Sequence, residues 1–121
     1  MKLKKAKILI QPMEDLKKEW KAALGGKVRS VQSEGTIIFV SLESLSKILT
    51  SERLEILSVI LKERPKSIYA LAKLVERDFK NVHSDVKFLA DVGLVELKTQ
   101  GARDSIVPRA KYSGIELDLA A

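Results

Sequence analysis

The sequence predicts an α+β fold in which two short helices are followed by a β-hairpin. Three observations support this. Two amphipathic helical patterns with a tight turn between them lie in the segment 67–92. Gly93 stops the second pattern, and an apolar strand follows it. A polar loop containing Gly101 then joins this strand to a second one. Helix, turn, helix and hairpin in this order predict a winged helix-turn-helix.

The N-terminal part predicts a strand–helix–strand extension. Lys2–Gln11 is a predicted strand, because Ala6, Ile8 and Ile10 alternate with other residues. Pro12 is suited to the first turn of a helix, and Gly25-Gly26 ends it. The predicted apolar face of this helix contains Met13, Leu16, Trp20, Ala23 and Leu24. Thr36–Val40 is rich in β-branched and aromatic residues and predicts a second strand.

Two helices are predicted between this extension and the helix-turn-helix. Ser41 can cap a short helix, and Thr50 or Ser51 can cap the next, which Pro65 ends near Arg64. The first helix carries Leu42, Leu45, Ile48 and Leu49, and the second is expected to have Leu54, Leu57, Ile60 and Leu61 inside.

The helix-turn-helix has the clearest pattern. Ser67 caps a helix whose buried stripe is Ile68, Leu71, Ala72 and Val75. Arg77-Asp78-Phe79 is the predicted turn, with Phe79 as its apolar anchor. The second helix, 80–92, buries Val82, Val86 and Leu89.

The remainder predicts a hairpin and a final strand. Val95 and Leu97 begin the first strand, Thr99–Asp104 forms the loop, and Pro108 stops the return strand Ser105–Val107. Ile115, Leu117 and Leu119 alternate with acidic residues, which is typical of an edge strand. The expected domains are an extension at 1–49, a winged helix-turn-helix at 50–109 and a C-terminal strand at 110–121.

Charge and composition limit the function. The net charge is +6 and the pI about 9.6, which favours an anionic partner such as nucleic acid. The segment 50–98, however, has 9 basic and 8 acidic residues, so DNA binding there must depend on a few well-placed groups. With no cysteine, one histidine and no recognisable catalytic constellation, we expect no enzyme, no metal and no cofactor. No apolar run is long enough to span a membrane, and a cytoplasmic protein is expected.

The second helix of the helix-turn-helix is the candidate DNA reader. A helix in the major groove needs hydrogen-bonding side chains opposite its buried stripe. Those candidates are Lys80, Asn81, His83, Ser84 and Lys87. Asp85 and Asp91 oppose DNA binding unless they face away or pair with Lys87 and Arg77. The alternative is that all of these residues form an ordinary solvated helix face.

Further contacts with phosphates are expected on both sides of this helix. Lys66, Ser67 and Tyr69 begin the preceding helix, and Lys98, Arg103 and Arg109 lie in the hairpin. Tyr69 could equally be a half-buried packing residue, and the hairpin could be an ordinary solvated one.

A homodimer is expected, since a two-fold protein reads two half-sites one turn of DNA apart. The candidate interface residues are Ile8, Ile10, Leu16, Trp20, Leu24, Ile115, Leu117 and Leu119. The C-terminal strand could pair across subunits, because an apolar edge strand must pair somewhere.

The region 50–108 resembles the winged helix of MarR-like prokaryotic transcriptional regulators. The resemblance depends on Leu71-Ala72, on the Asn81-Val82-His83-x-Asp85-Val86 run and on Leu89-x-x-x-Gly93-Leu94-Val95. A small archaeal and bacterial branch of these regulators is similar in the Phe79-Lys80-Asn81-Val82-His83 run and in the tail Ile115–Leu119. The front part, with Trp20 and Ile38-Phe39-Val40-Ser41-Leu42-Glu43, also resembles this branch. The resemblance implies a winged fold, a dimer, double-stranded DNA as ligand and, in some members, an antitoxin role. The chain lacks the long flanking dimer helices of the large ligand-sensing members.

The sequence therefore predicts a dimeric repressor-type regulator that reads the major groove with helix 80–92. The rival hypothesis is an antitoxin or protein-interaction module that binds a toxin or another protein. RNA is a weaker rival, because no aromatic stacking platform is visible.

Overall fold

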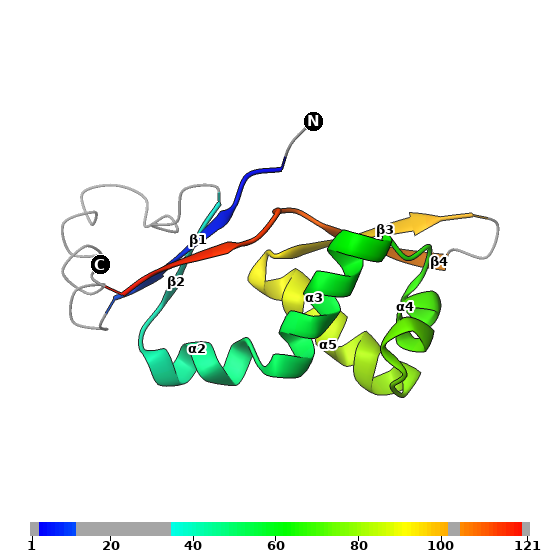
Figure 1. Cartoon of the computed structure of the whole chain (residues 1–121), viewed down its shortest axis with the longest axis horizontal. Coiled ribbons are helices and arrows are strands. Elements are labelled where there is room, and N and C mark those ends of the chain that lie inside the picture. The colour runs from blue at the N-terminus through cyan, green and yellow to red at the C-terminus, as the bar shows by residue number, and fades with distance from the viewer. Residues whose placement is uncertain (1–2, 12–34, 102–104, 120–121) are drawn as a thin grey trace, which may run out of the picture.

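The computed structural model describes residues 3–11, 35–101 and 105–119, which form an α+β protein. Figure 1 shows two parts side by side, a small sheet with α2 below it and a bundle of three helices beneath a β-hairpin. One hydrophobic core runs through both parts, since Ala6 and Ile8 of the sheet belong to the same buried cluster as Leu71 and Leu89 of the helices.

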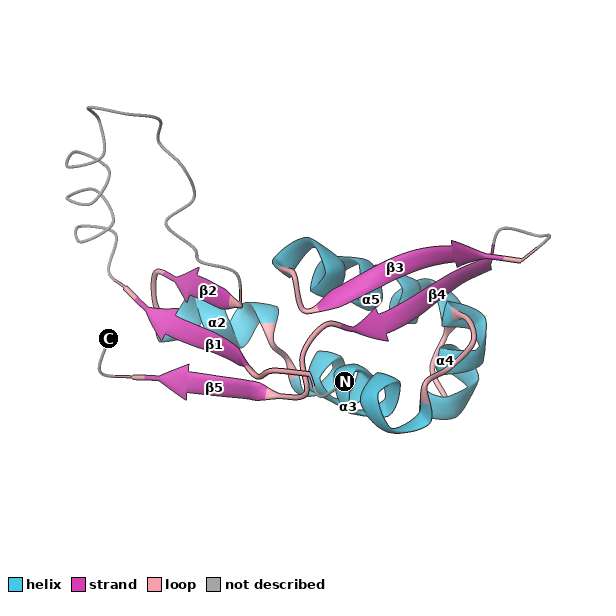
Figure 2. Ribbon diagram, turned by 90° about the horizontal axis from the view of Figure 1, so that it is seen from above, coloured by secondary structure: helices cyan, strands magenta, loops and turns pink. Residues whose placement is uncertain are grey.

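The small sheet is entirely parallel in its described strands. β1 (Ala6–Ile10) lies between β2 (Thr36–Phe39) and β5 (Ile115–Asp118). The first and last strands of the chain are therefore neighbours, as Figure 2 shows. The predicted extension and the predicted C-terminal strand thus form one sheet. The helix predicted at 12–24 lies outside the described residues.

Two capped helices lead from this sheet into the bundle. α2 (Leu42–Ile48) begins at Ser41, whose hydroxyl accepts a hydrogen bond from the Ser44 amide at 3.0 Å. α3 (Ser51–Glu63) is capped by Thr50 and ends at Arg64, which has a left-handed backbone before Pro65. The caps confirm the predicted starts, because each hydroxyl satisfies an amide that the first helical turn leaves free.

The predicted buried face of α3 was wrong in part. Ile56, Leu57 and Ile60 are buried, whereas Leu54 is 43% exposed and Leu61 is only half-buried. Apolar residues occur around most of this helix, so its sequence does not single out one stripe. The orientation is decided by the helices α4 and α5 that pack against it.

The two helices predicted to form a helix-turn-helix bury the predicted residues. α4 (Ile68–Val75) buries all four residues of its stripe, and α5 (Phe79–Val92) buries Val82, Val86 and Leu89 completely. Gly93 ends α5 with φ +97°, a conformation that glycine adopts without strain. The amides of Gly93 and Leu94 both donate to the carbonyl oxygen of Leu89, at 3.2 and 3.0 Å.

The hairpin strands are longer than predicted. β3 (Val95–Gln100) extends into the expected loop, and β4 (Ser105–Ala110) runs through Pro108, which pairs with Leu97. The Lys111 amide donates to the Leu94 carbonyl oxygen at 3.2 Å. This bond shows which opposite residues of the two strands are hydrogen-bonded pairs and which are not, because the two kinds alternate along an antiparallel ladder. Position 108 then falls where a backbone N–H would point away from β3. A proline there loses no ladder hydrogen bond, so it does not stop the strand.

Candidate nucleic-acid interface

The outer face of α5 is open and mostly polar, but it includes Phe88, which is 38% exposed and has the Arg53 guanidinium 4.1 Å from its ring centroid. Its fully buried stripe, Val82, Val86 and Leu89, fixes which side of the helix faces the core. Four of the five candidate readers are therefore exposed: Lys80, Asn81, Ser84 and Lys87. These side chains can donate and accept hydrogen bonds over about two turns of one helix surface.

His83, the fifth candidate, is half-buried and belongs to a row of aromatic side chains. Its ring centroid lies 5.7 Å from that of Phe79, which lies 6.2 Å from that of Tyr69 on α4. We call Tyr69, Phe79 and His83 the aromatic row. Tyr69 is exposed, so its interpretation as a half-buried packing residue was wrong. The sequence predicted that Phe79 anchors the turn in the core. This prediction was wrong, because Phe79 is 44% exposed.

The aromatic row forms one wall of a groove between the start of α4, the start of α5 and β4. This groove has a volume of about 500 Å³. It brings together four predicted site residues: Ser67, Tyr69, Lys80 and His83. It also contains Ile68, Phe79, Ser105 and Ile106, which sequence reasoning did not assign to a site. We call it the α4–α5 groove.

Ser67 has a structural role at the edge of this groove. Its hydroxyl accepts a hydrogen bond from the Ala70 amide at 3.0 Å and so caps α4. The same oxygen carries a hydrogen that remains available to an acceptor outside the helix. The N-terminal end of a helix is also where backbone dipoles favour negative charge.

Asp85 is held by two arginines from other parts of the fold. Arg53 Nε lies 3.1 Å from Asp85 Oδ1, and Arg77 Nη2 lies 3.0 Å from Oδ2. Arg53 also donates to the carbonyl oxygens of Lys47 and Ile48 at 3.1 and 2.8 Å. The carboxylate therefore joins α3 and α5 to the turn after α4. Of the two partners that the sequence offered for Asp85 and Asp91, Arg77 pairs with Asp85, and the pairing with Arg53 was not expected. The negative charge of Asp85 is compensated by the two arginines. Asp91, the other acidic residue of α5, is exposed.

Replacing Asp85 with Asn is expected to lower the free energy of unfolding by about 2 kcal/mol. The amide cannot accept from both guanidinium groups, and hydrogen bonds to charged groups contribute about 1.5–3 kcal/mol each. Urea unfolding measures the loss. Asp91→Asn, at an exposed aspartate on the same helix, is the control and should change stability by less than about 0.5 kcal/mol. Equal stability of the two variants would contradict the structural role of Asp85.

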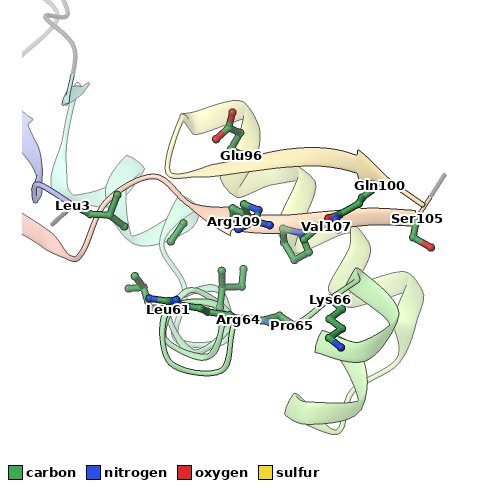
Figure 3. Close-up of a pocket in the computed structure, with 13 residues that line it drawn as sticks. Leu3, Leu61, Arg64, Pro65, Lys66, Glu96, Gln100, Ser105, Val107 and Arg109 are labelled. Atoms are coloured by element: carbon green, nitrogen blue, oxygen red, sulfur yellow. The ribbon is translucent and has the colours of Figure 1, made fainter. Parts of the chain in front are cut away.

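The positive groups of the hairpin lie away from the α4–α5 groove. Lys98 and Arg109 are exposed, and Arg109 lies opposite Glu96 in the ladder. Arg109 and Lys66 instead line a second, larger hollow of about 890 Å³ between α3 and β4 (Figure 3). Of the predicted phosphate contacts, Ser67 and Tyr69 line the α4–α5 groove, Lys66 and Arg109 line the larger hollow, and Lys98 lines neither. Ser105 lines both hollows. Arg103 lies outside the described residues.

The residues predicted to form a dimer interface differ in their exposure to solvent. Ile8 is buried within its own chain, so it is not part of any open surface and its assignment to an interface was wrong. Ile10 and Ile115 are half-buried in the same sheet. Leu117 and Leu119 are 45% and 66% exposed. Leu16, Trp20 and Leu24 lie outside the described residues.

Other site types were also sought in the described part of the chain. No group of three or more His, Cys, Asp or Glu side chains there could hold a metal ion. None of the helices described is long and apolar enough to cross a membrane.

Comparison with known proteins places the chain in a family. No match was found among curated proteins or among solved structures. The sequence model of one family matches residues 48–117, which is more than half of the chain and includes α3, α4, α5 and the hairpin. The protein therefore belongs to the HVO_A0114 family.

Proposed function

We propose that the protein is a sequence-specific regulator that binds double-stranded DNA through a winged helix-turn-helix. In this proposal α4 and α5 are the helix-turn-helix, and β3 and β4 are the wing. α5 enters the major groove, which is wide enough for one helix. We also propose that the protein is related to the MarR-like regulators that residues 50–108 resemble.

One observation carries the proposal. α5 exposes Lys80, Asn81, Ser84 and Lys87, while the carboxylate of Asp85 is compensated by Arg53 and Arg77. Without these two arginines, a negative charge in the middle of the helix would repel the phosphates of DNA. This pairing explains how a region with almost no net charge can still present an attractive helix face.

The roles follow from the chemistry of each side chain. Asn81 can pair with adenine through two hydrogen bonds, and Lys80 can donate to guanine. Ser67 and the N-terminal amides of α4 are suited to a phosphate, as are Lys66, Lys98 and Arg109. Phosphate contacts fix the position of the protein on DNA, and base contacts select the sequence.

We further propose a cytoplasmic, dimeric repressor without a cofactor or catalytic activity. Among the described strands, β5 lies at one edge of its sheet, Leu117 is exposed on it, and Leu119 is exposed just after it. An exposed edge strand with apolar side chains can pair with another strand. Pairing with a second copy would provide the two-fold symmetry that reads two half-sites.

Selection of bound fragments from random double-stranded DNA tests this proposal. We expect enrichment of one sequence pattern, with an affinity that falls steeply as the salt concentration rises. Repeating the binding with unrelated duplexes at the same salt concentration separates specific from non-specific attraction. Failure to enrich any pattern, together with no binding at low salt, would rule out the DNA-binding function.

The same edge strand supports a second candidate function, an antitoxin or protein-interaction module. Here the exposed side of β5 would contact a toxin or another protein instead of a second copy. A single partner that co-purifies with the wild type and is lost with Leu117→Asp would favour this function. Leu74→Asp, at an exposed leucine on α4, is the matched control.

A further inference from the structure

Phe79 is an aromatic residue that remains 44% exposed although it has the spacing of a core residue. It begins α5 and lines the α4–α5 groove next to Lys80. By spacing it belongs to the stripe of Val82, Val86 and Leu89, yet those three residues are fully buried and Phe79 is not. Contact with another molecule would remove this apolar ring surface from water, which is favourable.

The ring of Phe79 is held in place from both sides. The ring planes of Tyr69 and His83 are tilted by 50° and 40° to it, at centroid distances of 6.2 and 5.7 Å. Aromatic rings at such distances attract one another. The ring of Tyr69 is also engaged by Lys73, whose Nζ lies 4.6 Å from its centroid. Phe79 therefore presents a preorganised apolar surface at the N-terminal turn of α5, where little order is lost on binding.

We propose that Phe79 contacts the C5-methyl group of a thymine in the major groove and thereby helps to select the DNA sequence. The inference rests on the proposed function and deepens it. A phenyl ring has no polar atom with which to bind a phosphate or the hydrogen-bonding edge of a base. The apolar feature of the major groove is the thymine methyl group, which phenylalanine can contact. Residues at the start of a recognition helix are those that reach base edges.

The neighbours of Phe79 make this contact specific. Lys80 and Asn81 follow it directly and are exposed, so hydrogen-bonding groups lie beside the apolar ring. Ile106 of β4 extends the apolar lining of the groove across from α5. A thymine next to a guanine or an adenine would then be recognised by one apolar and one polar contact.

Removing one methyl group from DNA tests the proposal. Selection from unmodified random DNA first provides a bound sequence, in which thymine is the only source of a C5-methyl group. Each thymine is then replaced in turn by deoxyuridine, which pairs identically but lacks the methyl group. With the wild-type protein, replacement at one position should lower the affinity about fourfold, which corresponds to burial of one methyl group.

The Phe79→Ala variant should bind the thymine and deoxyuridine duplexes equally at that position. Leu74→Ala, which removes a similarly exposed apolar side chain outside the groove, should keep the full difference. Circular dichroism checks that both variants fold, and Phe79→Gln provides the same comparison if the alanine variant does not.

The outcomes separate this inference from the proposed function. If the wild type binds a selected sequence but no thymine methyl group matters, or if the methyl dependence survives without Phe79, the thymine contact is overturned and DNA binding stands. If no sequence is enriched at all, the proposed function fails and the thymine contact fails with it.

Discussion

Alanine at both Lys80 and Asn81 is expected to weaken binding to the selected DNA by about 100-fold or more. Each base contact of the type assigned to them contributes about 1–3 kcal/mol. Both side chains are exposed on α5, so the double variant should unfold at nearly the same denaturant concentration as the wild type. Fluorescence anisotropy with a labelled duplex at one fixed salt concentration measures the loss.

The control for this prediction is a lysine with the same charge in another place. Lys62 is exposed in the last turn of α3, and Lys62→Ala should weaken binding only slightly. A double variant that binds within about twofold of the wild type would remove the start of α5 from the DNA interface, since one lost base contact alone exceeds that factor. The single variants then apportion any loss between the two side chains.

Alanine at Leu89 is expected to lower the free energy of unfolding by about 3 kcal/mol. Leu89 is fully buried on the side of α5 that packs against α3 and α4. Truncating a buried leucine removes apolar contacts and leaves a cavity, at a cost of about 2–5 kcal/mol. Chemical denaturation followed by circular dichroism gives this value, and DNA binding should fall as the folded fraction falls.

Leu74→Ala provides the comparison for Leu89→Ala. Leu74 is half exposed on α4, so the same truncation leaves no enclosed cavity and should cost less than about 0.5 kcal/mol. A loss of less than about 0.5 kcal/mol in Leu89→Ala as well would show that the packing of α5 on its neighbours contributes little to stability.

Elements with strong local signals were predicted well. In α4, Ser67 caps the helix, and Ile68, Leu71, Ala72 and Val75 recur at the spacing of one helix face. This face is buried as predicted, although Tyr69 and Leu74 outside it are also apolar. In α3 the apolar residues Leu54, Ile56 and Leu57 point in different directions, and contacts with other helices decide which are buried. The prediction that Pro108 ends its strand was wrong for a related reason. Whether a proline interrupts a strand depends on whether its backbone nitrogen faces the neighbouring strand, and the sequence does not show this.

The candidate interface was only partly predictable from the sequence. The exposed positions on α5 follow from its helical period and could be predicted. The pairing of Asp85 with Arg53 joins residues 32 positions apart, and no local pattern contains it. Phe79 has the spacing of a core residue, so only the structure reveals its exposure.

The parallel pairing of β1 with β5 has a consequence for the order of folding. Ala6 of β1 lies beside Ile115, so the pairing must close a loop of more than 100 residues. During synthesis β1 emerges before β5 and cannot gain this neighbour until β5 has also left the ribosome. The helices and the hairpin, whose contacts are closer in sequence, are expected to form first. Completion of the sheet is then the late step, and it joins the two ends of the described chain.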